Sequence, residues 1–487
     1  MNPGVAPKES VVERFAPLFT PRTIAVVGAS AKGNGVAQGN RFIRHLRQVG
    51  YGGAIYPIHP SEQVVDDLIA YPSLAHTPES IDYAFIAIAG ERVPATLAAA
   101  NKRVRFAQVM SSGFGESVAG RELETALVEA ARLGGMRLIG PNCMGIHSPR
   151  GRLTFVDGGP DSAGTVGVMS QSGGLAIDVL QRGRARGLEF SGVVSIGNCA
   201  DLGPNDFLEY FLADAETRVI GAYLEHVANG RLFFEQLREA GASKPVVILK
   251  AGRTHQGQRA AASHTGSLAD NDQVWTAVAK QTGAILVDTL EEFIDALVVF
   301  QSYTPRLAPP TGRVLLFGNG GGASVLATDF LAKLGLDVVA VDANTAKALE
   351  RLELPAGASI ANPIDVPANI FQKDRGAIAQ TILEVVAQME GAEAILMHLN
   401  VPVILGYRHV DMLSDLINAA VRARAMCLGR THLLLALRSN GEPECEQRRR
   451  ECRLQAMKAG IPVFDELPNQ ARAMAAVHAH ERFRSLR

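Results

Sequence analysis

Short apolar runs alternate with amphipathic segments along nearly the whole chain. In the first third, the runs TIAVVGAS, GAIYPIHP, YAFIAIAG, FAQVMSSG and RLIGPNC have the length and composition of buried strands. Segments such as VPATLAAANKRV and RELETALVEAARLGG lie between them and have the periodicity of helices. Alternating strands and helices predict a parallel sheet covered by helices on both faces. This first domain is expected over residues 15–148.

The same pattern then starts again twice. The runs GTVGVMSQSGG, FSGVVSIGN, VIGAYLEHV, KPVVILKAG and AILVDTL predict a second domain over residues 160–302. The proline-containing stretch SYTPRLAPPTGR predicts a linker at residues 303–312, and a third cycle begins at RVLLFGNGGG and fills residues 313–487. We therefore expect an α/β protein in which an N-terminal Rossmann-like domain precedes two flavodoxin-like, doubly wound domains.

Composition limits the classes of partner. The chain has 487 residues with 48 basic and 49 acidic side chains, so its charge gives no reason to expect nucleic acid or an anionic membrane surface. The N-terminus has no apolar core of a signal peptide, and no stretch approaches the ~20 apolar residues of a membrane span. The five cysteines form no CxxC pair, which indicates a reducing, cytoplasmic setting without a zinc site or disulfides. No metal ligands are predicted.

Each predicted domain has a glycine-rich turn between a strand and a helix. The turns are VGASAKGNG (Val27–Gly35), SQSGGLAID (Ser170–Asp178) and GNGGGASVLATD (Gly318–Asp329). Such turns expose backbone N–H groups at a helix N-terminus, where an anion is favoured. Tight chain packing also explains any one of them, but three in one chain favour phosphate chemistry in at least one.

The first turn differs from a nicotinamide-dinucleotide fingerprint. It lacks the G-x-G-x-x-G spacing, and the next strand ends in IYPIHP without an acidic residue for a ribose hydroxyl. Lys32 within the turn favours a ligand with an additional phosphate. CoA, which has a pyrophosphate and a 3′-phosphate, meets that demand, whereas a Rossmann-type dehydrogenase is disfavoured.

A single histidine, His264, lies among small residues in the stretch AAASHTGSLAD. No cysteine or carboxylate stands at a metal-ligand spacing within it. The stretch is interpreted as a loop, and a solvated loop histidine is the simpler interpretation of these residues alone.

Ten segments together resemble a known family: IAVVGAS, IYPIHP, SSGFGE, IGPNCMG, SQSGGL, SIGN, AYLEHV, ASHTGSLA, GNGGGASVLATD and NPIDV, in this order. From about Phe15 to the C-terminus, the chain resembles the α-type subunit of nucleoside-diphosphate-forming (ADP-forming) acyl-CoA synthetases, the superfamily of succinyl-CoA synthetase. The resemblance implies a first domain that binds CoA. It also implies a reaction through an acyl phosphate and a phosphorylated histidine.

The resemblance assigns three catalytic features to the second domain. His264 would carry the phosphoryl group, and small neighbours would leave the approach to its ring open. Glu225, at the end of a strand, would orient that histidine and fix its tautomer. Ser172, Gly173 and Gly174 would open a helix whose N-terminus faces the phosphate. His226 is expected on the opposite side of the strand, without a role.

The resemblance also assigns CoA contacts to the first domain. The residues implied are Gly28, Ala29, Ser30, Lys32, Pro60, Ser112, Gly113 and Asn142.

A complete enzyme of this kind needs an ATP-grasp module for the nucleotide. No further domain fits after the third one, so the resemblance implies a separate ATP-grasp β-type subunit that supplies ATP or ADP and Mg²⁺ in a hetero-oligomer. The other substrate would be a small carboxylic acid, or an acyl-CoA in reverse. No motif names that acid or separates ADP from GDP. A non-catalytic, CoA-binding regulatory or scaffold protein of the same fold is the alternative.

Overall fold

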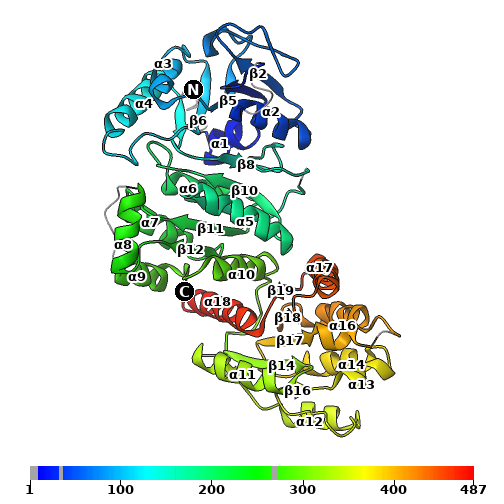
Figure 1. Cartoon of the computed structure of the whole chain (residues 1–487). Coiled ribbons are helices and arrows are strands. Elements are labelled where there is room, and N and C mark those ends of the chain that lie inside the picture. Colours follow the sequence, from blue (N-terminus) through cyan, green and yellow to red (C-terminus); the bar gives the residue numbers. More distant parts are fainter. Residues whose placement is uncertain (1–8, 32–36, 160, 266–271, 408) are drawn as a thin grey trace, which may run out of the picture. The chain divides into compact units, whose positions relative to one another are not determined.

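The computed structural model describes residues 9–31, 37–159, 161–265, 272–407 and 409–487, apart from the side chains of residues 261–265 and 373. The chain folds into two compact units. The first unit comprises Met1–Gln181 and Glu189–Asp288, and the second comprises Arg182–Leu188 and Thr289–Arg487. Figure 1 labels the helices and strands of both units.

The first domain is built on a parallel sheet of strand order β2-β1-β5-β6-β7. Its strands are β1 (Thr23–Val27), β2 (Ala54–Ile58), β5 (Ile81–Ile86), β6 (Val104–Val109) and β7 (Arg137–Ile139), and a small hairpin is formed by β3 (Val64–Val65) and β4 (Leu68–Ile69). The chain leaves β1 toward β2 and then crosses to β5 on the other side. This reversal is a topological switch point, where open α/β sheets bind ligands at the carboxyl ends of their strands.

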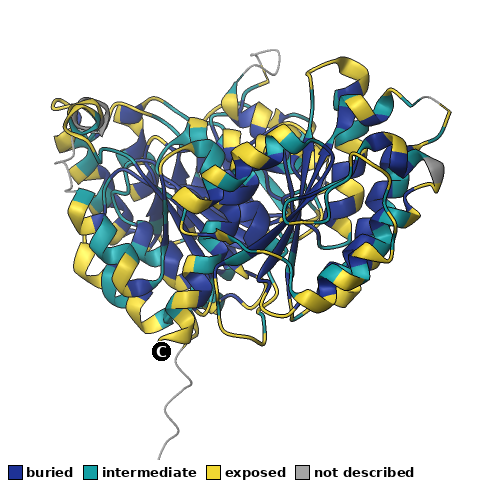
Figure 2. Ribbon diagram, turned by 90° about the horizontal axis from the view of Figure 1, so that it is seen from below, coloured by how far each residue is buried: buried dark blue, intermediate teal, exposed yellow. Residues whose placement is uncertain are grey.

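Helices cover both faces of this sheet. They are α1 (Val11–Phe19), α2 (Gln38–Gln48), α3 (Val93–Ala98) and α4 (Arg121–Leu133). Alternate residues of β1 explain why both faces are apolar: Ile24 and Val26 belong to the core under α1 and α2, while Ala25 and Val27 belong to the core under α3 and α4. The burial colours of Figure 2 show the same arrangement, with buried strands inside and exposed residues on the outer faces of helices.

The second sheet has the order β13-β12-β11-β9-β10-β8. Its strands are β8 (Gly145–His147), β9 (Val166–Ser170), β10 (Phe190–Ser195), β11 (Val219–Leu224), β12 (Val246–Lys250) and β13 (Ile285–Val287). Its helices are α5 (Gly173–Ala185), α6 (Pro204–Ala213), α7 (Gly230–Ala240), α8 (His255–Thr265) and α9 (Asp272–Thr282). All pairs are parallel except β8 with β10, so the segment expected to close the first domain supplies an edge strand to the second sheet. The switch point lies between β9 and β11.

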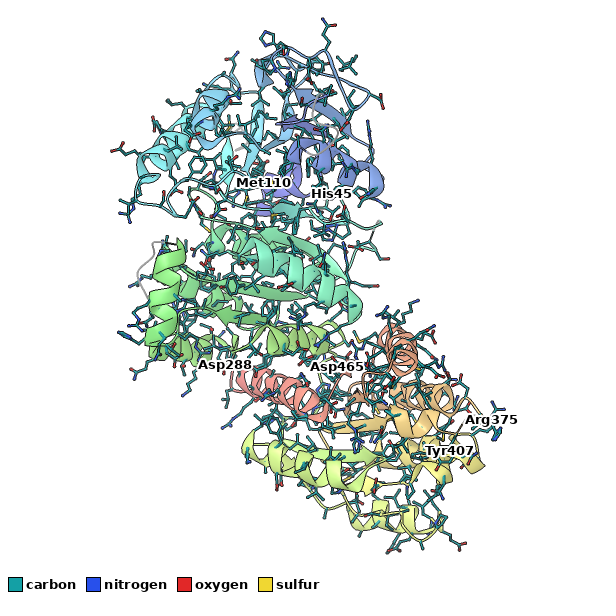
Figure 3. The ribbon with its side chains drawn as sticks, viewed as in Figure 1. His45, Met110, Asp288, Arg375, Tyr407 and Asp465 are labelled. Atoms are coloured by element: carbon teal, nitrogen blue, oxygen red, sulfur yellow. The ribbon has the colours of Figure 1, made fainter. Side chains whose placement is uncertain are left out.

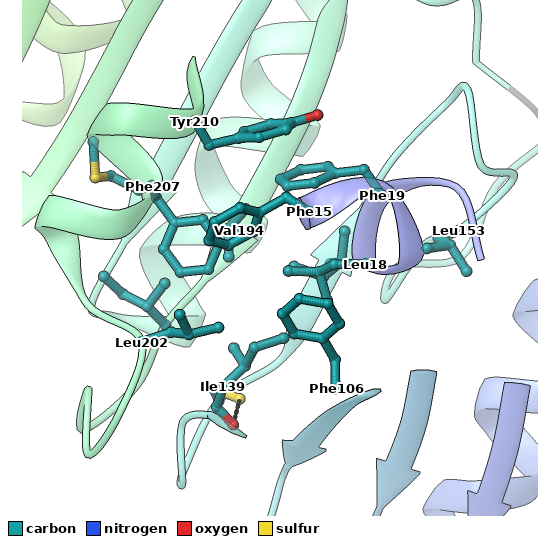
Figure 4. Close-up of a cluster of buried hydrophobic side chains, with 14 of the residues drawn as sticks. Phe15, Leu18, Phe19, Phe106, Ile139, Leu153, Val194, Leu202, Phe207 and Tyr210 are labelled. Atoms are coloured by element: carbon teal, nitrogen blue, oxygen red, sulfur yellow. Dashed lines mark hydrogen bonds between the residues drawn. The ribbon is translucent and has the colours of Figure 1, made fainter. Parts of the chain in front are cut away.

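A buried aromatic cluster joins these two domains within the first unit (Figure 4). Phe15 and Phe19 of α1 reach Phe106 of the first sheet on one side and Tyr210 of α6 on the other. The rings of Phe19 and Tyr210 stack with centroids 4.1 Å apart. Aromatic pairs of this kind add to the stabilisation from burial, so α1 acts as a packed bridge that fixes the two sheets relative to each other.

The second compact unit contains the third sheet, of order β15-β14-β17-β18-β19, with β16 paired to β14. Its strands are β14 (Arg313–Gly318), β15 (Asp337–Val338), β16 (Ile364–Asp365), β17 (Ala394–Asn400), β18 (His432–Arg438) and β19 (Val463–Phe464). Its helices are α10 (Leu290–Gln301), α11 (Gly321–Lys333), α12 (Ala343–Glu350), α13 (Ala368–Lys373), α14 (Ala377–Val386), α15 (Val401–Leu405), α16 (Met412–Cys427), α17 (Pro443–Lys458) and α18 (Leu467–Ser485). Helix α10, expected in the second domain, belongs to this unit because it packs along α18.

A buried histidine, His398, leads us to expect that the second unit loses stability in acid. His398 on β17 is fully buried with its Nε2 2.8 Å from the hydroxyl of Ser324, and burial lowers its pKa to about 3. A histidine in an unfolded chain titrates at about pH 6.5. As the pH falls below that value, the histidine binds a proton in the unfolded chain but stays neutral in the folded unit. The free energy of unfolding therefore decreases.

We expect the opening free energy that protects the β17 amides from hydrogen exchange to fall because of this histidine. The fall should be about 1.4 kcal/mol for each pH unit between about pH 6 and pH 4. Hydrogen exchange of β17 peptides, corrected for intrinsic rates, measures that slope. The His398→Gln variant should have a shallower slope, and the variant His409→Gln, which changes an exposed histidine of the same unit, should match the wild-type. Equal slopes for wild-type and His398→Gln would contradict the prediction.

Candidate active site

The first glycine turn lies at the first switch point. Gly28 follows β1 with φ +106°, and a Cβ on it would lie 2.2 Å from the carbonyl oxygen of Ala87 after β5, so a side chain is excluded there. Gly39 of α2 packs as closely on the turn, since its Cβ would lie 2.4 Å from the nitrogen of Ala29. The helix α2 therefore starts directly against the predicted CoA-binding turn.

Polar groups around this turn are already engaged by side chains. The N–H of Ser30 donates to Asn40 Oδ1 at 3.0 Å, and its hydroxyl donates to Glu62 Oε1 at 3.1 Å. Glu62 also accepts from the N–H of Ala31 at 2.6 Å. A carboxylate thus occupies donors of the kind that a phosphate would use. Lys32 lies outside the described residues.

The other predicted CoA residues are spread along the carboxyl edge of the first sheet. Pro60 follows β2 and is exposed, and Ser112 and Gly113 follow β6 and are exposed as well, Gly113 with φ +99°. Asn142 follows β7 in the left-handed region at φ +58°, with its side-chain nitrogen 3.5 Å from Asn198 Oδ1 of the second domain. Asn142 therefore contacts the second domain through its side chain.

The second glycine turn starts α5 beside the second switch point. Ser172 precedes Gly173, and its hydroxyl accepts the N–H of Leu175 at 3.3 Å, as an N-cap residue does. The first-turn N–H groups of a helix have no acceptor within it, so Gly173 and Gly174 present donors at the positive end of the α5 dipole. A Cβ on Gly173 would lie 3.0 Å from Met144 Cγ, which shows how closely the PNCMG segment approaches this helix start.

Glu225 follows β11 and is buried beside that helix start. The Oε1 of Gln171 accepts both the N–H of Glu225 at 2.6 Å and the N–H of His226 at 2.9 Å, so the end of β11 is fastened to the residue before Ser172. The hydroxyl of Tyr223 donates to Glu225 Oε1 at 3.0 Å. Burial raises the pKa of Tyr223, so this phenol remains a donor at neutral pH. The backbone of Glu225 is held as well, because its carbonyl accepts from Lys250 Nζ at 2.9 Å.

A cavity of about 410 Å³ lies within the first unit, beside Gln171 and the end of β11. It is lined by Gly115, Glu124, Asn142, Gln171, Gly197, Asn198, Cys199, Asp201, Gly203, Pro204, Asn205, Asp206, Glu225, His226, Ala228, Asn229 and Leu232. Backbone bonds tie its two walls together, since the N–H groups of Asn198 and Ala200 donate to the carbonyls of Pro141 and Gly140, both at 3.0 Å. The segments IGPNCMG and SIGN thus lie side by side, and the cavity brings Asn142 of the first domain together with Glu225 of the second.

The position of His226 corrects the sequence analysis. We expected His226 on the face opposite Glu225 because side chains alternate between the two faces of a strand. Strand β11 ends at Leu224, so this alternation does not extend to Glu225 and His226, and both residues line the cavity. Cys199 lines it too, with φ +59°, but burial raises the pKa of its thiol to about 12. A protonated thiol is a weak nucleophile, so the cavity has no cysteine activated for covalent catalysis among its described lining residues.

The position of His264 also departs from the expected loop. Helix α8 runs from His255 to Thr265, so the backbone of His264 belongs to the end of this helix. Its side chain lies outside the described residues. The expectation that Glu225 orients it therefore remains a prediction.

The third glycine turn stands at the switch point of the third sheet, between β14 and β17. A Cβ on Gly318 would lie 2.2 Å from the carbonyl oxygen of His398. The N–H of Gly320 donates to Asp365 Oδ1 at 2.7 Å, and the guanidinium of Arg438 donates to the carbonyl of Asn319 at 3.1 Å. All three turns thus have the same topological place.

Two family models match the first two domains. Residues 22–149 match the CoA binding domain, and residues 163–300 match the succinyl-CoA ligase like flavodoxin domain. These matches define the class: a CoA-binding Rossmann-like domain followed by a succinyl-CoA ligase-like domain, which confirms the predicted α/β architecture.

Curated relatives and a solved structure agree with that class. The chain is 35% identical over 370 residues to subunit alpha of acetate–CoA ligase (ADP-forming) II of Pyrococcus furiosus, covering 75% of this chain and 79% of the relative. It is 34% identical over 393 residues to acetate–CoA ligase (ADP-forming) I of Archaeoglobus fulgidus, covering 77% of this chain and 56% of that longer relative. The chain thus spans about half the length of the Archaeoglobus relative and about four-fifths of the Pyrococcus subunit.

The structure of the dinucleotide forming acetyl-coenzyme A synthetase 1 of Ca. Korarchaeum cryptofilum, in complex with phosphate and ADP, superposes with a TM-score of 0.82 at 29% identity, covering 97% of both chains. The chain belongs to the family of ADP-forming acyl-CoA ligases and is similar to their alpha subunits. Among the helices that the structure describes, none has both the length and the apolar character needed to cross a membrane.

Proposed function

We propose that this chain is the CoA-binding, phosphohistidine-carrying subunit of a ligase that joins a carboxylic acid to CoA and converts ATP to ADP and phosphate. The observation that supports it best is the cavity shared by Asn142 and Glu225. Asn142 belongs to the domain that matches the CoA-binding model, and Glu225 stands beside the helix start that suits a phosphate.

The proposed reaction has three steps. ATP phosphorylates a ring nitrogen of His264, and ADP leaves. A carboxylate oxygen of the acid then takes the phosphoryl group, so that the N–P bond breaks and an acyl phosphate forms. The CoA sulfur attacks the acyl carbon, phosphate leaves, and the thiol proton passes to phosphate or solvent. Glu225 orients the histidine in the first two steps, and the N–H groups that open α5 stabilise the phosphoryl oxygens.

A partner subunit would supply the nucleotide. Similarity to proteins named as alpha subunits supports this part of the proposal. We propose an ATP-grasp β-type subunit that binds ATP and Mg²⁺, with the phosphohistidine moving between the nucleotide and the cavity at Glu225. CoA would be held by the first domain of this chain, at the turn of Gly28 and Ser30, with Lys32 adding a positive charge for its phosphates.

A two-stage experiment tests the proposal. Calorimetry on the chain alone should detect CoA binding and no NAD binding. Mixing the chain with an ATP-grasp subunit of the same source, Mg²⁺, ATP, CoA and a panel of acids should then give acyl-CoA, ADP and phosphate in equal amounts. A chain that does not bind CoA would refute the proposal. CoA binding without ADP formation for any acid would instead support the regulatory alternative.

A further inference from the structure

His226 lines the cavity at Glu225, yet the proposed reaction gives it no role. Its backbone N–H donates to Gln171 Oε1 at 2.9 Å, the same oxygen that holds the N–H of Glu225. Gln171 directly precedes Ser172, whose hydroxyl caps the start of α5. His226 is therefore fastened to the wall that also supplies the groups proposed for phosphoryl transfer.

The imidazole of His226 has a buried nitrogen without a hydrogen-bond partner. Its Nδ1 is closed off from solvent and bonds to none of the residues that the structure describes. A proton on Nδ1 would be a buried N–H group without an acceptor, which is costly, and orphaned donors are rarer in proteins than under-satisfied acceptors. The neutral ring therefore has its proton on Nε2, so the residue offers an Nε2–H donor to the cavity.

Amide donors in the same wall are engaged within the protein. Asn198 Nδ2 donates to Glu124 Oε2 at 3.0 Å. Asn205 Nδ2 donates to Gln236 Oε1 at 3.2 Å. The Nε2 of Gln171 lies 3.4 Å from a thiol sulfur. The imidazole N–H has no such partner in the described part of the chain, so it is available to an oxygen of a ligand.

The cavity also borders the CoA-binding domain. Figure 3 labels Met110, which follows β6 on the side of the first domain turned toward the second sheet. Asn142 follows β7 at the same carboxyl edge and lines the cavity together with His226. A CoA sulfur that enters past Asn142 would therefore meet an acyl phosphate in the cavity that His226 lines.

We propose that His226 is a catalytic residue of thioester formation, and that its Nε2–H donates a hydrogen bond to the acyl oxygen. The CoA sulfur attacks the acyl carbon, and the electron pair of the C=O bond moves onto the oxygen, where the donor stabilises the charge. The carbonyl then re-forms, the bond from the acyl carbon to the phosphate oxygen breaks, and phosphate leaves. The thiol proton passes to phosphate or solvent, and His226 keeps its own proton. The inference rests on the proposed function, because it assumes an acyl phosphate in this cavity.

The His226→Leu variant, assayed together with the ATP-grasp subunit, tests this role. The panel of acids is acetate, propionate, butyrate, succinate and benzoate, and the acid with the highest wild-type turnover is used for every variant. His226→Leu should form acyl-CoA about a hundredfold more slowly, a typical cost of losing an oxyanion donor. Phosphorylation of the chain by labelled ATP should keep the wild-type rate, which also shows that the variant is folded. Hydroxamate formation, with hydroxylamine in place of CoA, should stay close to wild-type as well, since it reports the acyl phosphate alone.

Two amide variants locate the donor on the ring. The side-chain N–H₂ group of glutamine stands near the position of Nε2, and that of asparagine stands near Nδ1. His226→Gln should therefore retain most of the acyl-CoA rate, and His226→Asn should be as slow as His226→Leu. His255→Asn changes an exposed histidine of the same unit and should match the wild-type in all three assays.

The outcomes separate the two proposals. A wild-type acyl-CoA rate in His226→Leu, or an equal loss of hydroxamate and acyl-CoA, would overturn the role of His226 in thioester formation and leave the proposed function standing. A His226→Gln variant as slow as His226→Leu would overturn the hydrogen-bond role, since the ring would then be needed for something that an amide N–H cannot do. A wild-type pair that forms neither hydroxamate nor acyl-CoA from any acid of the panel would refute the proposed function and this inference together.

Discussion

His264→Ala should abolish phosphorylation of the chain. With the ATP-grasp subunit, Mg²⁺ and labelled ATP, the wild-type chain is expected to take up one acid-labile phosphoryl group, since a phosphorus–nitrogen bond hydrolyses in acid. Removing the nucleophile of a covalent mechanism typically lowers turnover by at least about a thousandfold. CoA affinity should not change, because the predicted CoA residues belong to the first domain.

The same helix offers a matched control. His255 is exposed and opens α8, the helix in which His264 lies near the other end, so His255→Ala changes a histidine of the same element without touching the proposed nucleophile. The control should be labelled like the wild-type. Label retained by His264→Ala, or lost by His255→Ala alone, would show that another residue carries the phosphoryl group.

The family resemblance selects Glu225, Ser172 and Asn142 as candidates, and strand topology explains where such residues stand. Glu225 and Ser172 each follow a strand in a predicted parallel sheet, so both had to stand at its carboxyl edge. The structure places them beside each other because β9 and β11 are neighbours at the switch point. Asn142 follows a strand of the first sheet by the same reasoning. Its meeting with Glu225 depends on backbone bonds between the two domains, which no local pattern indicates.

Other features depend on contacts between distant segments. Strand β8 has three residues and pairs with β10, some 45 positions later, so periodicity alone could not assign it to the second sheet. Gln171 stands within the SQSGG segment, but its clamp on the end of β11 is a tertiary contact. The sequence does contain a signal for α8, because the run of alanines before His264 has high helix propensity and the helix includes it.

Glu225→Gln should slow the phosphorylation of His264 by about a hundredfold without abolishing it, a typical cost for losing a positioned acid–base partner. The glutamine keeps the size of the side chain and can still accept from the hydroxyl of Tyr223 through Oε1. It replaces the second carboxylate oxygen by an N–H₂ group, which cannot accept a proton from the imidazole. The histidine is then no longer held in the tautomer that leaves its reactive nitrogen free.

Rapid-quench labelling of the wild-type and variant pairs measures this rate. Glu235→Gln on α7, whose carboxylate pairs with exposed Arg231, is the matched control and should label at the wild-type rate. Tyr223→Phe should show a smaller loss, since it removes one hydrogen bond to Glu225 Oε1 but leaves the carboxylate charge in place. A Glu225→Gln variant that labels as fast as the wild-type would separate this glutamate from phosphoryl transfer. The cavity it lines would then belong to CoA or to the acid alone.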